Sequence, residues 1–478
     1  MAKLLRGLLY LIGILVLVIV AAVVVIPLVV DPNDYRDKIT QVVEEKTGRK
    51  LDIKGDLGLS VFPWLALEIG PTTLSNAQGF TAENFAAVEN VQVRVKLLPL
   101  LRKQVEMDKI VLKGLALNLE KNKAGQTNWD DLSAGAEKTE EKPVEETDSA
   151  GLPLDGLSIG GVEITDASVI WDDRSGGVRY SIAPFSLNTG EINPGKPVSI
   201  DMDMQLEGGA PVMKGGVAFD GIVHLSESMQ QIQLKDVVLD VDLTGESLPG
   251  SKLKAVLKTA ANLDLEAQTL STSQLALSTL GIVLEGNLTG KQIMEDARVI
   301  SGNFKLQPFS PKELLQALGQ VTPETSDPAV LGKADASWAM QFESDKLALS
   351  DFLLHLDDTT VQGNLNVAQF AKPAIRFDLA VDSIDADRYL APASEATPVP
   401  ATPTTAAAAG SAGAIPVDTL RDLNLSGALK IGAMKAFQLR SQDIVMNVSA
   451  KGGKLRLHPA SANMYEGSYK GDVRLDVT

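Results

Sequence analysis

Hydrophobic and polar residues follow two different patterns along this chain. The first is an unbroken apolar run from Gly7 to Val30, which contains no charged residue. As a helix with a rise of ~1.5 Å per residue, such a run is long enough to cross the ~30 Å hydrocarbon core of a bilayer. We therefore expect a single transmembrane anchor over residues 1–30. The positions taken to mark this anchor are Gly7, Leu8, Leu11, Leu15, Val20, Val25 and Val30.

The charges that flank this run predict its orientation. Lys3 and Arg6 precede it, and Asp31 and Asp34 follow it. By the positive-inside tendency, the N-terminus stays in the cytoplasm and the rest of the chain lies across the membrane. A cleaved signal peptide is less favoured, because the apolar part of such a peptide is ~7–15 residues long. A buried soluble helix is also less favoured, because a helix that is apolar all round needs a large core around it.

The second pattern begins at Arg49 and is an alternation of apolar and polar residues. It is clear at 91–97, and again at 201–207, where Met202, Met204 and Leu206 alternate with acidic and amide side chains. The runs are short and end at Gly, Asn, Asp or Ser. Strands of this kind, with turns every ~8–12 residues, are typical of antiparallel sheet. The sequence therefore predicts a mainly β protein.

One internal repeat is visible within the strand pattern. The run Ile110, Leu112, Leu115, Leu117 and Leu119 recurs as Val162, Ile164, Ala167, Val169 and Trp171. Both copies have a break after the second member, and Gly125 and Gly177 follow at the same distance. Two strand–kink–strand units of one pattern favour a sheet that is extended by repetition.

Three short helices are expected among the strands. Asn33 or Asp34 can cap a helix that reaches about Thr47 and stops at Gly48; we expect it to plug the end of the domain that follows, although it could also lie at the membrane interface. A second helix is predicted around 81–87. The third covers 310–319, because Ser310-Pro311-Lys312-Glu313 is a capping box with proline at the first helical position.

Two stretches of biased composition divide the strands into regions. Residues 137–148 are dominated by Glu, and residues 391–414 are almost entirely Ala, Pro, Thr, Gly and Ser. Neither carries an apolar period, so we expect a disordered loop and a flexible linker. Because the sequence stops within a strand pattern, its last region is also consistent with a truncated chain. The expected organisation is an anchor at 1–30, an N-terminal part at 31–133, an acidic loop at 134–156, a long β region at 157–390, a linker at 391–416 and a C-terminal β region at 417–478.

The alternating strands have one wet face and one dry face, and a dry face must be covered. Two sheets can cover each other, a sheet can close into a barrel, or acyl chains can cover an open trough. Residue pattern alone leaves all three open. The low aromatic content of 5% is typical of a smooth aliphatic lining more than of a tightly packed sandwich. The candidate lining residues are Leu239, Val241, Leu243, Leu263, Leu265, Leu275, Leu277, Ile282 and Leu284.

Composition excludes several classes of function. The net charge of −17 disfavours a partner such as nucleic acid, which needs a basic surface. There is no Cys, and His224, His355 and His458 have no metal-ligand spacing, so we expect neither a metal site nor a cofactor. The carboxylate pairs at 130–131 and 357–358 could in principle do acid–base chemistry. Neighbouring residues on a strand point to opposite faces, however, so we interpret these pairs as turn and strand-end residues and expect no catalytic residues.

The chain resembles the AsmA family of bacterial envelope proteins, and the resemblance runs in the expected order over nearly the whole sequence. The departure is the missing C-terminal closure, so the resemblance does not define the far end of the fold. The motifs that carry the resemblance are Asp31-Pro32-Asn33-Asp34-Tyr35, Thr47-Gly48-Arg49, Phe62-Pro63-Trp64-Leu65, Val95-Lys96-Leu97-Leu98-Pro99, Asn128-Trp129-Asp130-Asp131-Leu132, Leu356-Asp357-Asp358, Asp385-Ala386-Asp387-Arg388-Tyr389-Leu390 and Tyr465-Glu466-Gly467.

The resemblance implies a fold and a role that the residue pattern alone does not. The implied fold is an elongated, twisted, open β-groove, related in shape to bridge-like lipid-transfer proteins, with an inner-membrane anchor and a periplasmic body. The implied partners are the inner membrane, glycerophospholipids and outer-membrane assembly proteins. We expect a passive carrier or conduit for lipid acyl chains that supports outer-membrane assembly. The alternative is a scaffold that aids insertion of outer-membrane proteins through its sheet edges.

Overall fold

A computed structural model describes residues 31–60, 65–96, 107–134, 159–193, 195–392 and 423–478. The predicted anchor at 1–30, the acidic stretch, the Ala- and Pro-rich stretch and the motif residues 62–64 and 97–99 lie outside these ranges. Among the residues described, no helix is long and apolar enough to span a membrane. The chain divides into two compact units, Met1–Lys254 and Ala255–Thr478.

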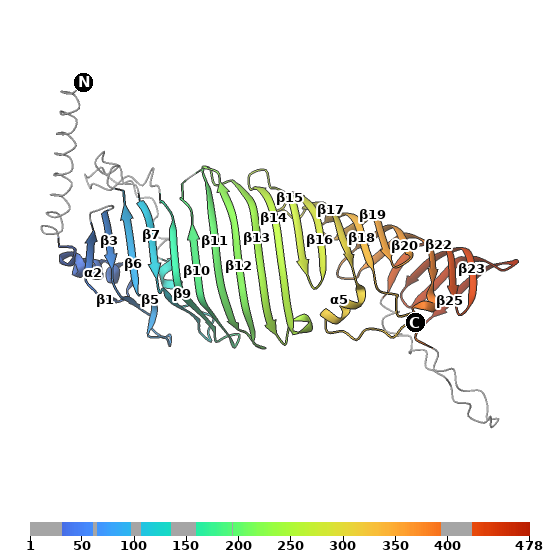
Figure 1. The fold of residues 1–478 in the computed structure, drawn as a ribbon, viewed down its shortest axis with the longest axis horizontal. Helices are drawn as coiled ribbons and strands as arrows, with labels where there is room; N and C mark the ends of the chain where they lie inside the picture. The colour runs from blue at the N-terminus through green and yellow to red at the C-terminus, as the bar shows by residue number, and fades with distance from the viewer. Residues whose placement is uncertain (1–30, 61–64, 97–106, 135–158, 194, 393–422) are drawn as a thin grey trace, which may run out of the picture. The chain divides into compact units, whose positions relative to one another are not determined.

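The first unit is a bent sheet that begins with a short helical segment (Figure 1). The 3-10 helix η1 (Pro32–Tyr35) leads into α2 (Arg36–Thr47), which ends where Gly48 adopts a φ of 68°. The helix expected here is therefore confirmed. A second short helix, α4 (Asp130–Ala134), and a 3-10 turn, η2 (Pro249–Ser251), complete the helical part. The strands are β1 (Leu51–Ile53), β2 (Leu57–Ser60), β3 (Leu65–Ile69), β4 (Thr72–Ser75), β5 (Asn84–Val88), β6 (Asn90–Val95), β7 (Met107–Lys113), β8 (Ala116–Lys121), β9 (Val162–Asp173), β10 (Val178–Thr189), β11 (Pro197–Gly208), β12 (Met213–Leu225) and β13 (Gln231–Gly245).

The early strands of this unit are long strands broken in the middle. β1 and β2, β3 and β4, β5 and β6, and β7 and β8 are each separated by one to three residues. The breaks lie side by side across the sheet, because Lys54 N donates to Pro71 O (2.8 Å) and Glu89 N donates to Lys113 O (3.1 Å). The helix expected at 81–87 is wrong, since this segment enters the ladder as β5, where Ala86 pairs with Leu74 and with Leu117.

The internal repeat corresponds to neighbouring strands. β9 runs parallel to β7 over its first half and to β8 over its second half. Ile110 is opposite Val162 and Leu117 is opposite Val169, so the strand residues of the first copy face their equivalents in the second. A parallel pair requires a crossover connection of a dozen or more residues. The acidic stretch occupies that position in the chain.

The remaining strands of the first unit form an antiparallel meander. β9, β10, β11, β12 and β13 pair in chain order. They stand side by side in Figure 1. The burial pattern of β11 alternates strictly between exposed and half-buried positions. One face of the sheet is therefore more covered than the other.

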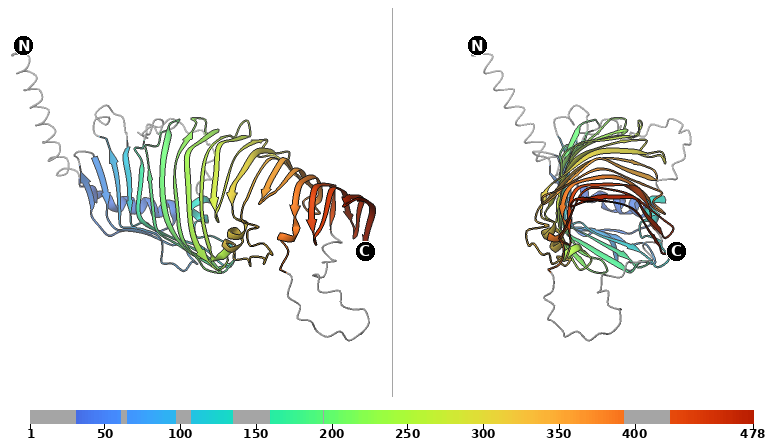
Figure 2. Two further views of the ribbon diagram at one scale, coloured as in Figure 1. Left: turned by 45° about the vertical axis from the view of Figure 1, so that its right-hand side comes forward. Right: turned by 90° about the vertical axis from the view of Figure 1, so that its right-hand side faces the viewer.

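The second unit is also an open sheet, and its strands pair in chain order. Every pair from β14 to β25 is antiparallel except β21–β22, which is parallel. The Ala- and Pro-rich stretch lies between these two strands in the sequence. Figure 2 shows these strands bowed along their length. The strands are β14 (Lys252–Asp264, of which Ala255 onward belongs here), β15 (Thr269–Thr279), β16 (Ile282–Lys291), β17 (Val299–Phe309), β18 (Ala334–Glu343), β19 (Lys346–Leu356), β20 (Thr359–Ala368), β21 (Ala374–Asp385), β22 (Asn424–Ala436), β23 (Leu439–Lys451), β24 (Lys454–Met464) and β25 (Gly467–Asp476).

Two helical pieces interrupt the second unit. α5 (Pro311–Ala317) begins at Ser310, whose hydroxyl accepts a hydrogen bond from Glu313 N (3.3 Å). The helix expected from the capping box is therefore confirmed. The 3-10 helix η3 (Ala386–Arg388) follows β21 directly. The expected β class and open, mostly antiparallel sheet are confirmed for each unit.

Candidate functional site

A continuous row of aliphatic side chains crosses the second unit on one face of its sheet. The row follows from the register of the strands, because directly paired residues point to the same face. It crosses ten strands from β14 to β23, and consecutive members are cross-strand partners. The row consists of Leu257, Leu277, Leu284, Leu306, Ala336, Leu354, Val361, Val381, Ile431 and Ile444.

A second row on the same sheet runs near the other end of the strands. It extends from Leu263 and Leu270 in β14 and β15 to Leu455 and Leu475 in β24 and β25. Between them lie Gly290, Ile300, Phe342, Leu347, Val367, Ile375, Leu425 and Ala450. The adjacent positions, which point to the opposite face, are polar or small, as at Gln341, Asn366 and Arg376. The sheet therefore has one apolar and one polar face.

The apolar face has little protein over it. Only eleven hydrophobic side chains are buried among the residues that the structure describes, and five of these are alanines. A packed core of this size would bury most of its Leu, Val and Ile side chains. Here the members of both rows are mostly half-buried instead. Ala336, Ile431 and Ile444 of the first row are the exceptions, since they are buried. Within the described ranges, no second sheet lies over this apolar face.

The candidate lining residues fall into two groups. In the first unit Leu239, Val241 and Leu243 are opposite Phe219, Val217 and Gly215, and continue apolar rows through β11 and β10. In the second unit Leu263, Leu275, Leu277, Ile282 and Leu284 share the apolar face described above, whereas Leu265 lies in the turn after β14. All nine side chains are half-buried. Their role as a lining stays a prediction.

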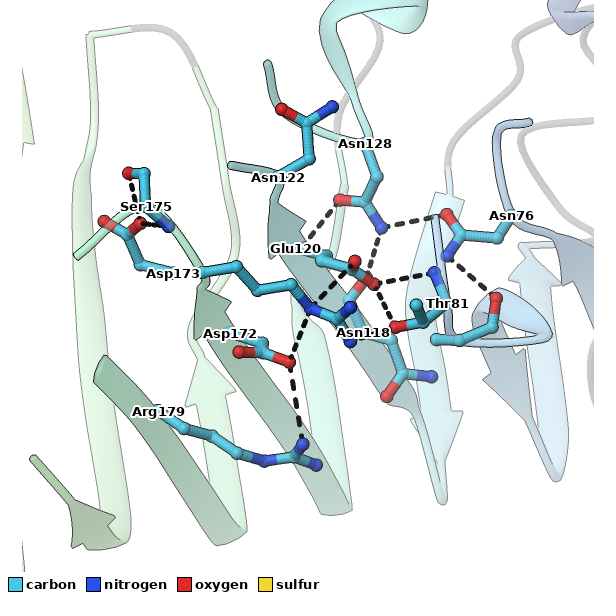
Figure 3. Close-up of polar contacts among 12 residues, drawn as sticks. Asn76, Thr81, Asn118, Glu120, Asn122, Asn128, Asp172, Asp173, Ser175 and Arg179 are labelled. Carbon is cyan, nitrogen blue, oxygen red and sulfur yellow. Dashed lines mark hydrogen bonds and ion pairs between the residues drawn. The ribbon is translucent and has the colours of Figure 1, made fainter. Parts of the chain in front are cut away.

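A network of polar side chains connects several strands of the first unit near their ends (Figure 3). The buried carboxylate of Glu120 accepts hydrogen bonds from Thr81 N (3.0 Å) and Thr81 Oγ1 (2.8 Å) and pairs with Arg174 at 3.2 Å. Burial alone would raise the pKa of Glu120, but these hydrogen bonds and Arg174 outweigh it, so the pKa lies below its usual value. The fully buried Asn128 donates to Asn76 Oδ1 (2.9 Å) and accepts from Glu120 N (2.9 Å). These contacts join the C-terminal ends of β4, β8 and β9.

Arg49 extends this polar network towards the start of the sheet. Its side chain is 2% exposed and donates to Asp131 Oδ2 (3.0 Å), to Asp131 Oδ1 (2.5 Å) and to Asn128 O (2.6 Å). The guanidinium also lies 4.6 Å from the centre of the Phe85 ring. The hydrogen bonds from Arg49 lower the pKa of Asp131. The family-like motifs at 47–49 and 128–132 therefore meet in a structural ion pair.

A second polar cluster holds the segment 310–333, here called the strap, against the second unit. Asp357 accepts hydrogen bonds from the backbone N–H groups of Leu331 (2.7 Å), Gly332 (3.0 Å) and Lys333 (3.1 Å). Its Oδ2 also accepts from Tyr389 Oη (2.8 Å). Val330, within the strap, is fully buried. The carboxylate pair at 357–358 therefore has a structural role in fixing the strap.

Replacing Asp357 with alanine is expected to release the strap. Burial tends to raise the pKa of Asp357, but the hydrogen bonds from Leu331, Tyr389, Lys333 and Gly332 bring it below its usual value. Because the folded pKa is depressed, the carboxylate stabilises the fold above the unfolded pKa of ~3.9, and this contribution is lost as the pH falls through the folded value. Hydrogen bonds to a charged group contribute ~1.5–3 kcal/mol.

The strap can be followed by hydrogen exchange. In D357A the amides of residues 331–333 should exchange about tenfold faster or more at neutral pH, while amides of β22 and β23 stay protected. The wild-type protein should show the same local loss only in acid. Unchanged exchange of these three amides in D357A would contradict the assignment.

No group of three or more His, Cys, Asp or Glu side chains that could hold a metal ion occurs within the described ranges. His355 Nδ1 lies 2.8 Å from Asp335 Oδ2, and His224 Nε2 lies 2.9 Å from Gly195 O. Asp130 accepts hydrogen bonds from Thr127, and Asp358 from Arg388. These histidines and carboxylates thus each have a structural partner.

Each unit, within the described ranges, is thus an open, mostly antiparallel β-sheet, and the sheet of the second unit has one apolar and one polar face. The AsmA family model matches residues 1–478, so the chain belongs to the AsmA family. The chain is also similar to Protein AsmA of Escherichia coli (strain K12), with 35% identity over 106 residues. That match covers 22% of this chain and 17% of the E. coli protein. No solved structure matches significantly.

Proposed function

We propose that this protein binds the acyl chains of glycerophospholipids on its apolar face and supports lipid transport to, and assembly of, the bacterial outer membrane. The observation that carries the proposal is the aliphatic row of ten residues across β14–β23. With ~4.8 Å between neighbouring strands, this row extends about 43 Å across the sheet. Seven of its ten side chains are half-buried and three are buried. A partly exposed apolar surface of this extent marks a binding surface.

Acyl chains are suited to this surface. Each CH₂ group that leaves water contributes about 0.8 kcal/mol, so a chain of many such groups binds without any specific polar contact. Leu, Ile and Val make up most of both rows, and such a lining fits hydrocarbon of varied length. Transfer along it requires no covalent chemistry. In this proposal the protein is therefore a passive lipid carrier or conduit and not an enzyme.

The proposed location follows from the family and from the apolar run at Gly7–Val30. The chain would be held in the inner membrane by that single span, with its N-terminus in the cytoplasm and both units in the periplasm. The apolar face would then receive lipid next to the membrane that holds the protein. Its partners would be the inner membrane, phospholipids and outer-membrane assembly proteins.

Native mass spectrometry of the full-length chain, released gently from detergent, tests the proposal. We expect several phospholipids to copurify, and to be replaced by added palmitic acid because the apolar face binds the tails. A chain that carries no lipid and takes up no fatty acid would contradict the proposal.

One observation favours the alternative function, a scaffold for outer-membrane proteins. Among the described residues, β25 pairs only with β24, and Tyr469, Val473 and Leu475 on it are 45%, 47% and 36% exposed. An exposed edge strand can pair with a strand of another protein. Photo-crosslinking from Val473 separates the two functions, because capture of outer-membrane proteins favours the scaffold and capture of lipid favours the groove.

A further inference from the structure

Exposed apolar side chains gather at one end of the strands β22–β25 (Figure 1). Phe437 and Tyr465 are each 77% exposed, and Leu439 is 52% exposed. The turns that carry them are neighbours, because Ser441 near the start of β23 pairs with Met464 at the end of β24. Neighbouring strands are ~4.8 Å apart, so Phe437, Leu439 and Tyr465 belong to one short stretch of the sheet's rim, here called the rim patch. Apolar residues that gather in this way, unlike a single exposed one, mark an interaction surface.

The geometry of the turn between β22 and β23 does not account for its phenylalanine. Phe437 and Gln438 have φ values of 51° and 64°. Hairpin turns with two positive φ values favour Asn-Gly or Gly-Gly, because a bulky side chain is strained there. The turn between β23 and β24 has the same pattern, with φ of 55° at Gly452 and 77° at Gly453. Strain of this kind is retained where a side chain has a function.

Packing within the sheet does not account for the aromatic residues of the rim patch either. Phe370, in the turn between β20 and β21 at the opposite ends of the strands, stacks on Phe342 with 6.0 Å between ring centroids. The rings of Phe437 and Tyr465 have no aromatic or cation–π partner among the residues that the structure describes. Their apolar surface is therefore available to a partner.

Two basic side chains flank the rim patch. Arg440 lies beside Tyr465 across the β23–β24 pair, and Lys470 lies on β25 close to the same turn. Both are exposed, and neither has a hydrogen bond or ion pair within the described ranges. Glu466 and Asp443 are the exposed acids nearby. The local charge is thus close to balanced, whereas the whole chain carries −17, so this edge can approach anionic phosphate groups.

A lipid bilayer suits the rim patch better than a folded protein. The apolar side chains stand on two narrow turns, and a fluid interface accommodates such turns whatever their spacing. Tyrosine is enriched at membrane interfaces, because its ring is apolar and its hydroxyl reaches water. Arg440 and Lys470 lie where they can pair with lipid phosphates while the apolar side chains enter the interface.

We propose that the rim patch is a docking surface for a lipid bilayer other than the one that holds the apolar run at Gly7–Val30. Phe437, Leu439 and Tyr465 enter the interfacial region of that bilayer, and Arg440 and Lys470 pair with its phosphates. The proposal rests on the function proposed above, because a chain already attached to one membrane must contact another to transport lipid between them.

The test uses the full-length chain in nanodiscs, which keep the apolar run in lipid. The nanodiscs are mixed with protein-free vesicles of phosphatidylcholine, with or without phosphatidylglycerol, and co-flotation measures docking against empty nanodiscs. F437N/Q438G and Y465N remove the aromatic side chains and introduce residues that these turns prefer, so both variants keep the fold. F370N, at the opposite ends of the strands, is the matched control.

We expect wild-type nanodiscs to float with both kinds of vesicle. F437N/Q438G should weaken docking about tenfold, because the phenylalanine side chain no longer leaves water. Y465N should act in the same direction, and F370N should dock as the wild type does. R440Q should weaken docking about fivefold, and only to vesicles that contain phosphatidylglycerol.

A dye can show which part of the chain meets the vesicle. Because the sequence has no Cys, Q438C and K451C each introduce a single thiol, at opposite ends of β23. A polarity-sensitive dye at Q438C should report an apolar environment when vesicles are added, and the same dye at K451C should not. Equal responses at the two positions would overturn the rim patch as the docking surface.

The flotation results separate this proposal from the function on which it rests. Wild-type nanodiscs that do not float, or F437N/Q438G nanodiscs that float as well as the wild type, overturn the docking surface. Every variant should still bind palmitic acid like the wild type, because the aliphatic rows are unchanged. If the wild-type chain binds no palmitic acid, the lipid-binding function fails, whatever the flotation shows.

Discussion

Replacing Leu277 with lysine is expected to lower acyl-chain binding at least tenfold. Leu277 lies in the aliphatic row between Leu257 and Leu284, which are its cross-strand partners. A lysine there places an ammonium group within the path of the hydrocarbon, where a charge without a partner is strongly disfavoured. The effect should be large because the row is continuous, so a single charge interrupts it. Palmitic acid binding to the full-length chain measures the loss.

The adjacent residue supplies the control. Ser278 is exposed and points to the opposite, polar face. S278K introduces the same charge into the same strand without touching the aliphatic row, so it should bind palmitic acid as the wild type does. Thermal unfolding of both variants verifies that they remain folded. Equal binding by L277K and S278K would show that the apolar face is not the site.

The strands were predictable from sequence because their signal is local. A side-chain period of two fixes which residues share a face, whatever the neighbouring strand is. The capping box at Ser310 and Gly48 at the end of α2 are equally local, and both helices occur where expected. The internal repeat predicted a sheet extended by repetition, and its two copies are indeed neighbouring strands in matched register.

Local composition predicted the wrong element at residues 81–87, because pairing with neighbouring strands determines the structure there. Residues 81–87 contain Glu and three Ala, which favour helix. Ala86 and Ala87 nevertheless pair with β4 on one side and with β8 on the other. Backbone pairing on both sides outweighs a preference of a few tenths of a kcal/mol per residue.

The polar clusters could not be predicted because their members are distant in sequence. Arg49 and Asp131 are separated by 82 positions, and Asp327 and Arg388 by 61. Nothing in the spacing of the motifs indicates that they meet. Asp385 and Lys435 are likewise 50 positions apart, and they meet only through the parallel pairing of β21 with β22.

The second large effect is expected for the ion pair between Arg49 and Asp131, where removing the acid should cost more than removing both partners. Arg49 is 2% exposed, whereas Asp131 is 42% exposed. Asp131→Ala therefore leaves a buried guanidinium without a counter-charge, at a cost of about 3 kcal/mol, the lower end of the range for broken buried pairs because Asp131 is partly hydrated. The double variant R49M/D131A carries no charge at either position and should recover much of this loss, since methionine can still pack on Phe85.

Amide hydrogen exchange at Glu120 and Asn128 measures this effect, because both residues belong to the network that Arg49 joins. In D131A the free energy of opening at these amides should fall by about 3 kcal/mol. Asp130→Ala is the matched control: this neighbouring carboxylate is exposed and accepts hydrogen bonds from Thr127, so its loss should cost no more than ~1 kcal/mol. If the double variant opens more readily than D131A, the cost arises from lost hydrogen bonds and packing of Arg49. The buried charge would then not explain the instability of D131A.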